Sequence, residues 1–175
     1  MDLRIQTEPK ENLFETTTVV LVVERPEAIA PSEAISDLMR RFRSRDTRPE
    51  VKLRSALHRR GLRFRLHRSV PGAPRRTIDI AFPSERVAVF VDGCFWHSCP
   101  RHGKTPDRNG AWWQDKLAAN TTRDRDTDQL LTQAGWEVLR YWEHEDPIDV
   151  ANEVVRAVRS RRREPPDLGA NAVDP

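Results

Sequence analysis

The segment "TIDIAFPSERVAVFVDGCFWHSCPRHG", residues 77–103, contains the pattern that decides the fold. Two apolar runs, residues 77–82 and 86–93, read as β-strands on either side of a turn at Pro83 and Ser84. Helical patterns lie before and after this pair of strands, so we expect a mixed α/β domain with a small central sheet. Each strand carries one aspartate, and both cysteines of the chain follow the second strand.

Helix signals surround these strands. Thr47 can cap a helix that has Pro49 in its first turn and that Gly61 ends. Residues 111–134 predict a long helix that Gly135 stops. The other expected elements are a short helix from Ser32 that carries Met39, strands over 63–66 and 136–144, a turn over 70–76, and a closing helix over 149–158.

The expected domain organisation has three parts. Residues 1–31 are acidic and lack sustained periodicity, so we expect a mostly disordered arm. Residues 32–158 form one compact domain without an internal repeat. Residues 159–175 read as a disordered tail.

Charge is unevenly distributed along a chain whose net charge is only +3. From Met1 to Asp37 there are eight acids and three bases, whereas from Arg40 to Arg76 there are fourteen bases and two acids. The basic block fits a polyanion partner, most simply nucleic acid, although an ordinary solvated face explains it about equally well. No apolar run is long enough to span a bilayer and no secretory signal is recognisable, so we expect a cytoplasmic protein with reduced thiols.

The two cysteines predict a metal site. Cys94, Cys99 and His102 supply three ligands on one short loop, and zinc favours four ligands in a tetrahedron. His144, directly after the last expected strand, is a candidate for the fourth ligand, and His97 is a rival for the third. His58 and His67 are less well placed. The alternative is two buried thiols and two surface histidines.

Acidic residues predict a second kind of site. Asp79 lies inside an apolar strand and Asp92 ends the next, and acids on adjacent strands can hold Mg²⁺. Glu50, near the start of the preceding helix, could add an outer carboxylate. The pattern is weak alone, because Asp79 could pair with an arginine and Asp92 could simply make a turn.

Aromatic pairs flank the cysteine loop. For Phe95-Trp96 and Trp112-Trp113, we expect at least one ring of each pair to point away from the core, where rings can stack on or wedge between bases. In the long helix, spacing places Lys116, Asn120 and Asp124 on one face. Asp124 could there orient a histidine, although on spacing alone a solvated helix face is the better explanation.

Three segments together resemble a known family. They are "RDTRPEVKLRSALHRRGLRFRLH", "RVAVFVDGCFWHSCPRHG" and "WWQDKLAANTTRDRDTDQLLTQAGWEVLRYWEHE". They are similar to the very-short-patch repair (Vsr) mismatch endonucleases over residues 36–145. The resemblance implies a restriction-endonuclease-like fold, of the PD-(D/E)xK type, with a structural zinc. It also implies Mg²⁺-dependent nicking 5′ to the thymine of a T·G mismatch left by deamination of 5-methylcytosine.

The resemblance also implies roles for individual residues. Asp79 would be the main Mg²⁺ ligand, assisted by the backbone carbonyl of Val91. His97 would be the general base, Asp124 its orienting partner, and Glu50 would complete the acidic site. The implied zinc ligands are Cys94, Cys99, His102 and His144. The implied DNA-contacting residues are the wedges Phe95, Trp96 and Trp113 from the major groove and Met39 from the minor groove.

The chain departs from the family pattern at two places. The run before the first catalytic strand, "PGAPRRTID", is four residues longer than the usual Pro-Gly-Arg-Pro-Asp. Some members have histidine where this chain has Asp92, which leaves Asp92 either a metal ligand or an outer base.

The implied partner is duplex DNA with a T·G mismatch, bound by a monomer, and mismatch-repair proteins are further candidate partners. Two other hypotheses stay open. One is a nuclease of the same fold that cuts another DNA substrate, and the other is a non-catalytic zinc module that binds DNA.

Overall fold

The computed structural model describes residues 45–107 and 109–164. The expected helix that carries Met39 and the arm over residues 1–31 lie outside this range. Within the described residues, no helix combines the length and the apolar character needed to cross a membrane.

A four-stranded sheet forms the centre of the molecule, in the order β1-β2-β3-β4. The strands are β1 (Arg65–Val70), β2 (Ala73–Phe82), β3 (Val87–Asp92) and β4 (Glu137–Trp142). The first three pair antiparallel, whereas β3 and β4 pair parallel. A parallel pair needs a crossover, and α3 (Gly110–Gln133) supplies it.

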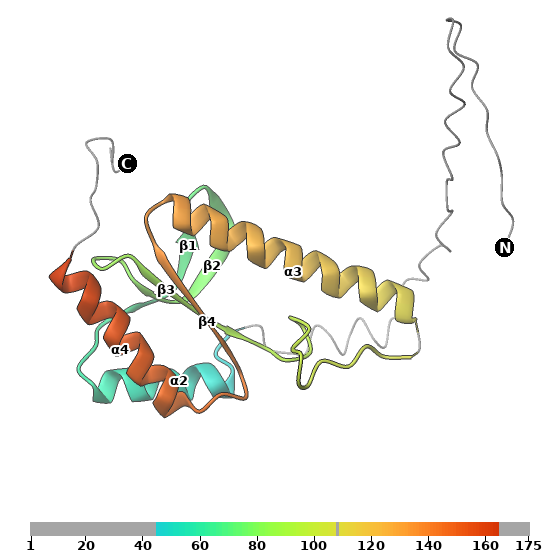
Figure 1. The fold of residues 1–175 in the computed structure, drawn as a ribbon, viewed down its shortest axis with the longest axis horizontal. Coiled ribbons are helices and arrows are strands. Elements are labelled where there is room, and N and C mark those ends of the chain that lie inside the picture. Colours follow the sequence, from blue (N-terminus) through green and yellow to red (C-terminus); the bar gives the residue numbers. More distant parts are fainter. Residues whose placement is uncertain (1–44, 108, 165–175) are drawn as a thin grey trace, which may run out of the picture.

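Helices cover both faces of the sheet (Figure 1). The helices α2 (Arg48–Arg59) and α4 (Pro147–Arg163) pack together on one face, and α3 lies on the other. Side chains of β3 alternate between these two layers: Val87 and Val89 join the core under α2 and α4, and Ala88 and Phe90 join the core under α3. Burial on both faces explains why this strand is apolar almost throughout. The mixed α/β architecture is therefore confirmed and is consistent with a restriction-endonuclease-like fold.

The capping and glycine signals in the sequence mark helix ends that the structure confirms. Thr47 caps α2, Pro49 stands in its first turn, and Gly61 takes a φ of +76° just after it. Gly135 likewise has a φ of +78° after α3. Glycine adopts this left-handed conformation without steric cost, so both positions end their helices as predicted.

The expected limits of the other elements need correction. The strand expected over 63–66 is β1, which starts at Arg65 and runs to Val70. The turn expected over 70–76 shrinks to Pro71 and Gly72, because β2 already begins at Ala73. Pro74 is tolerated there because the register of the β1–β2 ladder shifts at this end.

The closing helix is longer than expected at both ends. Asp146 caps α4 through its carboxylate, which accepts a hydrogen bond from the amide of Ile148 at 2.7 Å, and Pro147 opens the helix. The helix continues to Arg163, into the segment expected to be a disordered tail. Ion pairs from Arg161 to Glu137 and from Arg162 to Glu85 fasten this last turn to the rest of the domain.

Candidate functional site

The candidate site lies where the parallel strands β3 and β4 reach their carboxyl ends. Open sheets with helices on both faces commonly bind ligands outside these ends. Asp92 ends β3, Trp142 ends β4, and the two are partners in the ladder. The segment between β3 and α3 starts here and carries both cysteines, two histidines and two aromatic residues.

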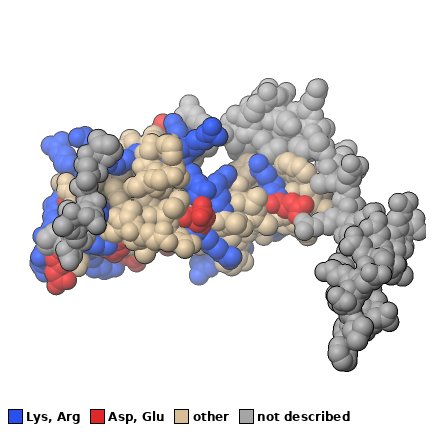
Figure 2. Space-filling model, turned by 90° about the horizontal axis from the view of Figure 1, so that it is seen from above, with Lys and Arg blue, Asp and Glu red and all other residues tan. Residues whose placement is uncertain are grey.

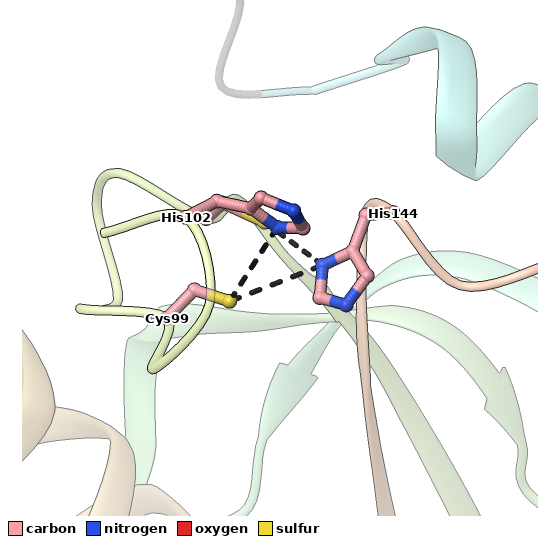
Figure 3. Close-up of side chains that lie close together, drawn as sticks. Cys99, His102 and His144 are labelled. Carbon is pink, nitrogen blue, oxygen red and sulfur yellow. Dashed lines mark hydrogen bonds between the residues drawn. The ribbon is translucent and has the colours of Figure 1, made fainter. Parts of the chain in front are cut away.

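Four metal-type side chains meet at this end of the sheet. One donor atom from each residue lies within 4.8 Å of all the others, in the set Cys94, Cys99, His102 and His144. The Sγ atom of Cys94 lies 3.1 Å from Nδ1 of His144 and 3.7 Å from Nδ1 of His102. The Sγ atom of Cys99 lies 3.9 Å from each of these nitrogens. Dashed lines in Figure 3 mark these two contacts.

These distances fit a tetrahedral metal ion. Zinc bonds of about 2.3 Å to sulfur and about 2.0 Å to nitrogen place neighbouring ligand atoms about 3.5 Å apart. Burial and the adjacent Cys99 thiol raise the pKa of Cys94 to about 11. A thiol of this kind keeps its proton unless a cation displaces it. The four residues could thus hold a metal ion, and their donor types suit zinc.

Backbone hydrogen bonds fold the loop around this cluster. The amide of Cys99 donates to the carbonyl of Cys94 at 2.9 Å, and the amide of Gly103 donates to the carbonyl of Cys99 at 2.7 Å. A Cβ atom at residue 103 would lie 2.6 Å from the Cys99 carbonyl oxygen, so this close approach requires glycine. Glu143 Oε1 accepts from the Cys94 amide at 2.7 Å and joins the loop to the end of β4.

His97 stands apart from the metal cluster and pairs with Asp124. The Nδ1 atom of His97 lies 2.6 Å from Oδ2 of Asp124 on α3. Burial disfavours the charged imidazole, but the hydrogen bond to Asp124 and the charge of Asp92 outweigh it and raise the pKa of His97. The same contact lowers the pKa of Asp124 against the opposing effect of burial. The structure therefore forms a carboxylate–imidazole pair of the kind that orients a general base.

Asp79 lies on β2, in a half-buried position. Its Oδ2 accepts a hydrogen bond from the backbone amide of Val91 at 3.0 Å. Burial, together with the negative charges of Glu50 and Asp92, raises the pKa of Asp79 to about 6. A carboxylate held among other acids is suited to a cation, which would relieve their mutual repulsion.

Glu50 has a structural task besides its proximity to Asp79. It is 3% exposed and completes the capping box of α2 with Thr47. Its Oε2 also accepts from Arg54 Nη2 at 2.6 Å. Glu50 forms a second potential metal group with Asp46 and His67, but Arg54 binds both acids and already supplies a positive charge.

Arg140, which was not expected from the sequence to belong to the site, connects several of these acids. Its Nη1 donates to both oxygens of Asp92 at 2.7 and 2.8 Å, and its Nε donates to both oxygens of Asp128 at 2.9 and 3.1 Å. Its Nη2 lies 3.6 Å from Asp124 Oδ1. The one available signal was an arginine within the apolar run of the last strand.

The aromatic residues of the two pairs form one group. The ring centroid of Trp113 lies 5.1 Å from that of Phe95, 6.2 Å from that of Trp96 and 4.9 Å from that of Trp112. Trp113 is buried at the centre of the group, and the other three rings are half-buried. Asn120 donates to the carbonyl of Trp96 at 3.1 Å, so the Asn120–Asp124 face of α3 packs on the loop and is not simply solvated.

Basic side chains do not form one continuous patch on the face that Figure 2 shows. Lysine and arginine gather there in several groups separated by uncharged surface, and acidic side chains lie beside some of them. Within the expected basic block, exposed arginines include Arg68 and Arg75 on the β1–β2 hairpin, whereas Arg54 is buried.

Comparison with known proteins identifies the class. The Type II nicking enzyme V.NaeI of Lentzea aerocolonigenes is 48% identical over 120 residues, which cover 67% of this chain and 72% of that enzyme. The Type II nicking enzyme V.XorIIP of Xanthomonas oryzae pv. oryzae is 46% identical over 111 residues, covering 62% and 78%. The DNA mismatch endonuclease Vsr of Escherichia coli (strain K12) is 37% identical over 107 residues, covering 60% and 66%.

These relatives make the chain a DNA endonuclease. A family model described as DNA mismatch endonuclease Vsr also matches residues 29–102. The chain belongs to the Vsr family. The resemblance found in the sequence is thus confirmed, and the hypothesis of a non-catalytic zinc module is set aside.

Proposed function

We propose that this endonuclease nicks one DNA strand 5′ to the thymine of a T·G mismatch, in very-short-patch repair of deaminated 5-methylcytosine. The observation that carries the proposal is the His97–Asp124 pair, with its 2.6 Å hydrogen bond. The same loop holds this base and the aromatic side chains Phe95 and Trp96. Recognition and cleavage would therefore be coupled by one short segment of chain.

The proposed chemistry is phosphodiester hydrolysis. Mg²⁺ held by Asp79, with the Val91 carbonyl as a further oxygen ligand, would stabilise the negative charge of the transition state. Asp124 engages Nδ1 of His97, so Nε2 takes the proton from the attacking water. Glu50 acts as an outer acid that adds negative charge near Asp79.

Zinc bound by the four-residue cluster would be structural. It would join the loop that bears His97 to His144, just beyond the end of β4. Because all four ligand positions are filled by protein, no position would be left for substrate.

Mismatch selection would come from the aromatic group. A T·G wobble pair stacks less well than a matched pair, so insertion of a ring beside it costs less unstacking energy. Phe95 and Trp96 are half-buried against Trp113, which would support them from behind. The probing role of Met39 is part of the same proposal. We expect a monomer, with mismatch-repair proteins as further partners.

A strand-nicking assay tests the proposal. End-labelled duplexes that carry T·G or C·G in varied flanking contexts are incubated with Mg²⁺ or with EDTA. We expect a Mg²⁺-dependent nick 5′ to the mismatched thymine, abolished in Asp79→Asn and selectively lost in Phe95→Ala/Trp96→Ala.

The names of the nicking-enzyme relatives support a second candidate, a nicking enzyme with another DNA substrate. Equal cutting of both duplexes, insensitive to loss of the two rings, would favour that candidate.

A further inference from the structure

Arg140 is the centre of a charge network that includes the proposed general-base pair. It lies on β4 opposite Phe90 in the ladder, and its guanidinium carbon sits 4.5 Å from the centroid of the Phe90 ring. From this position it contacts three carboxylates, those of Asp92, Asp124 and Asp128.

We propose that Arg140 is a positioning residue, which holds Asp92 away from His97 so that the hydrogen bond of His97 Nδ1 goes to Asp124. This inference rests on the proposed function of the site, because it takes His97 as the general base. Arg140 would control the orientation of that base without touching the reacting atoms. The inference also assigns Asp92 a structural partner in place of a metal.

The distances around His97 support the proposal. The Nδ1 atom of His97 lies 2.6 Å from Asp124 Oδ2 but also 3.8 Å from Asp92 Oδ1. Two carboxylates are thus close enough to compete for one nitrogen. Both oxygens of Asp92 instead accept from Nη1 of Arg140, which leaves the shorter contact to Asp124.

Burial makes the role of Arg140 hard to replace. Asp92 is 8% exposed, and a buried carboxylate without a partner is costly. Among the described residues, the basic side chain that would remain within 4 Å of Asp92 without the guanidinium is the His97 ring. Arg140 can hold its three acids together because its planar fork presents five N–H donors, whereas lysine offers a single charged nitrogen.

Kinetics with a matched set of variants test the proposal. Single-turnover nicking is measured at saturating DNA, and DNA affinity is measured separately by fluorescence anisotropy with Ca²⁺ in place of Mg²⁺. The variants are Arg140→Met, Arg140→Lys, Asp92→Asn and the double variant Arg140→Met/Asp92→Asn. Arg161→Met is the control, because Arg161 is equally half-buried and paired with Glu137 but belongs to α4.

We expect Arg140→Met to lower the nicking rate about 10- to 100-fold, the range typical of residues that orient functional ligands. DNA affinity should stay unchanged, and Arg140→Lys should recover part of the rate. The double variant should nick faster than the product of the two single effects predicts, since the neutral amide introduced by Asp92→Asn no longer competes for His97. Arg161→Met should nick at the wild-type rate.

Three results would overturn the proposal: an unchanged rate in Arg140→Met, a loss confined to DNA affinity, or effects of the two substitutions that simply multiply. If the wild-type protein prefers another duplex, the T·G proposal fails and the same variants are compared on that duplex. If the wild-type protein cuts no duplex, a crystal structure of Arg140→Met tests the role of Arg140 through the orientation of the His97 ring. A His97 ring turned toward Asp92 supports the role of Arg140, and an unchanged His97–Asp124 contact contradicts it.

Discussion

At the scale of single residues, the site depends on carboxylates kept close together in partly buried positions. Asp79, Asp92 and Asp124 all act on the electrostatics of His97 or of one another. The charge of Asp92 raises the pKa of Asp79 and also that of His97, so it disfavours the charged carboxylate but favours the charged imidazole. The pH dependence of the enzyme and the stability of its fold should both reflect these pairings.

The first prediction concerns pH. A general base works when neutral, so the nicking rate should rise with pH through the pKa of His97, which Asp124 and Asp92 raise above its usual range. Asp124→Asn removes the bond to a charged partner. The acid limb should then move to lower pH, while the maximal rate falls about 10- to 100-fold because the ring is no longer held in place.

Single-turnover rates across about pH 5 to 9 would check this prediction, because the range spans the ordinary pKa of histidine. Asp126→Asn is the matched control, since Asp126 lies on the same helix but pairs with Arg76 at 2.5 Å. Its profile should match that of the wild type. An acid limb that stays in place in Asp124→Asn would mean that another group titrates.

The second prediction concerns stability. A carboxyl group whose pKa rises from 3.8 to about 6 on folding binds its proton more tightly in the folded state. The ionised carboxylate therefore lowers the free energy of unfolding most above pH 6, and this destabilising effect disappears below pH 4. Without Mg²⁺, Asp79→Asn should raise the free energy of unfolding at neutral pH by up to about 3 kcal/mol, from 1.36 kcal/mol per pKa unit.

Urea unfolding of Asp79→Asn and wild type, at neutral pH and again near pH 4, would measure this difference. The gain should shrink toward zero at the lower pH. A variant that is less stable than wild type at neutral pH would show that the carboxylate contributes more through the Val91 hydrogen bond than it costs by burial.

At the scale of elements, the sequence predicted the parts whose signals are local. Thr47, Gly61 and Gly135 mark helix ends through the conformation of one or two residues, and the structure agrees at all three. The strand limits were less predictable, because the start of β2 depends on pairing with β1. The capping pair Asp146-Pro147 is also a local signal, and it starts α4 two residues before the expected position.

In the candidate site, too, the residues with local sequence signals were predictable and those that depend on the fold were not. Residue type and spacing suggested the cysteine–histidine group, because three of its members lie within nine residues. Arg140 gave no comparable signal, since its partners Asp128 and Asp92 lie 12 and 48 residues away in the chain. Only the fold brings them together.

The third prediction concerns the loop between β3 and α3. In Gly103→Ala the new methyl group would meet the Cys99 carbonyl oxygen at 2.6 Å and the Cys99 nitrogen at 3.0 Å, and both are backbone atoms that cannot rotate away. We expect the metal cluster to open and bound zinc to be lost. Thermal stability should fall with it.

Gly110→Ala is the matched control, because a Cβ at residue 110 would meet nothing within 4 Å. That variant should keep its zinc and gain up to about 1 kcal/mol of stability from the lower helix propensity of glycine. Zinc content by mass spectrometry and thermal unfolding would be measured for both. Full zinc occupancy in Gly103→Ala would contradict the prediction.

At the scale of the whole molecule, binding should divide between recognition of the mismatch and attraction to phosphates. Strands β1 and β2 form an antiparallel hairpin in the sheet, and this hairpin presents the exposed arginines Arg68 and Arg75. Helix α4, on one face of the sheet, presents Arg156 and Arg159, which are also exposed. Net charge is equal in the two pairs, so position alone distinguishes them.

The last prediction tests which of these regions faces DNA. Each phosphate contact releases about one counterion, so Arg68→Gln/Arg75→Gln should reduce the slope of log affinity against log salt by about 2. The loss of affinity should be the same for T·G and C·G duplexes, because phosphate contacts carry no base information. Arg156→Gln/Arg159→Gln should keep the wild-type slope. Anisotropy titrations at several salt concentrations measure the slope for both double variants. An unchanged slope in the hairpin variant, together with a reduced slope in the α4 variant, would show that the duplex binds on the α4 side of the molecule.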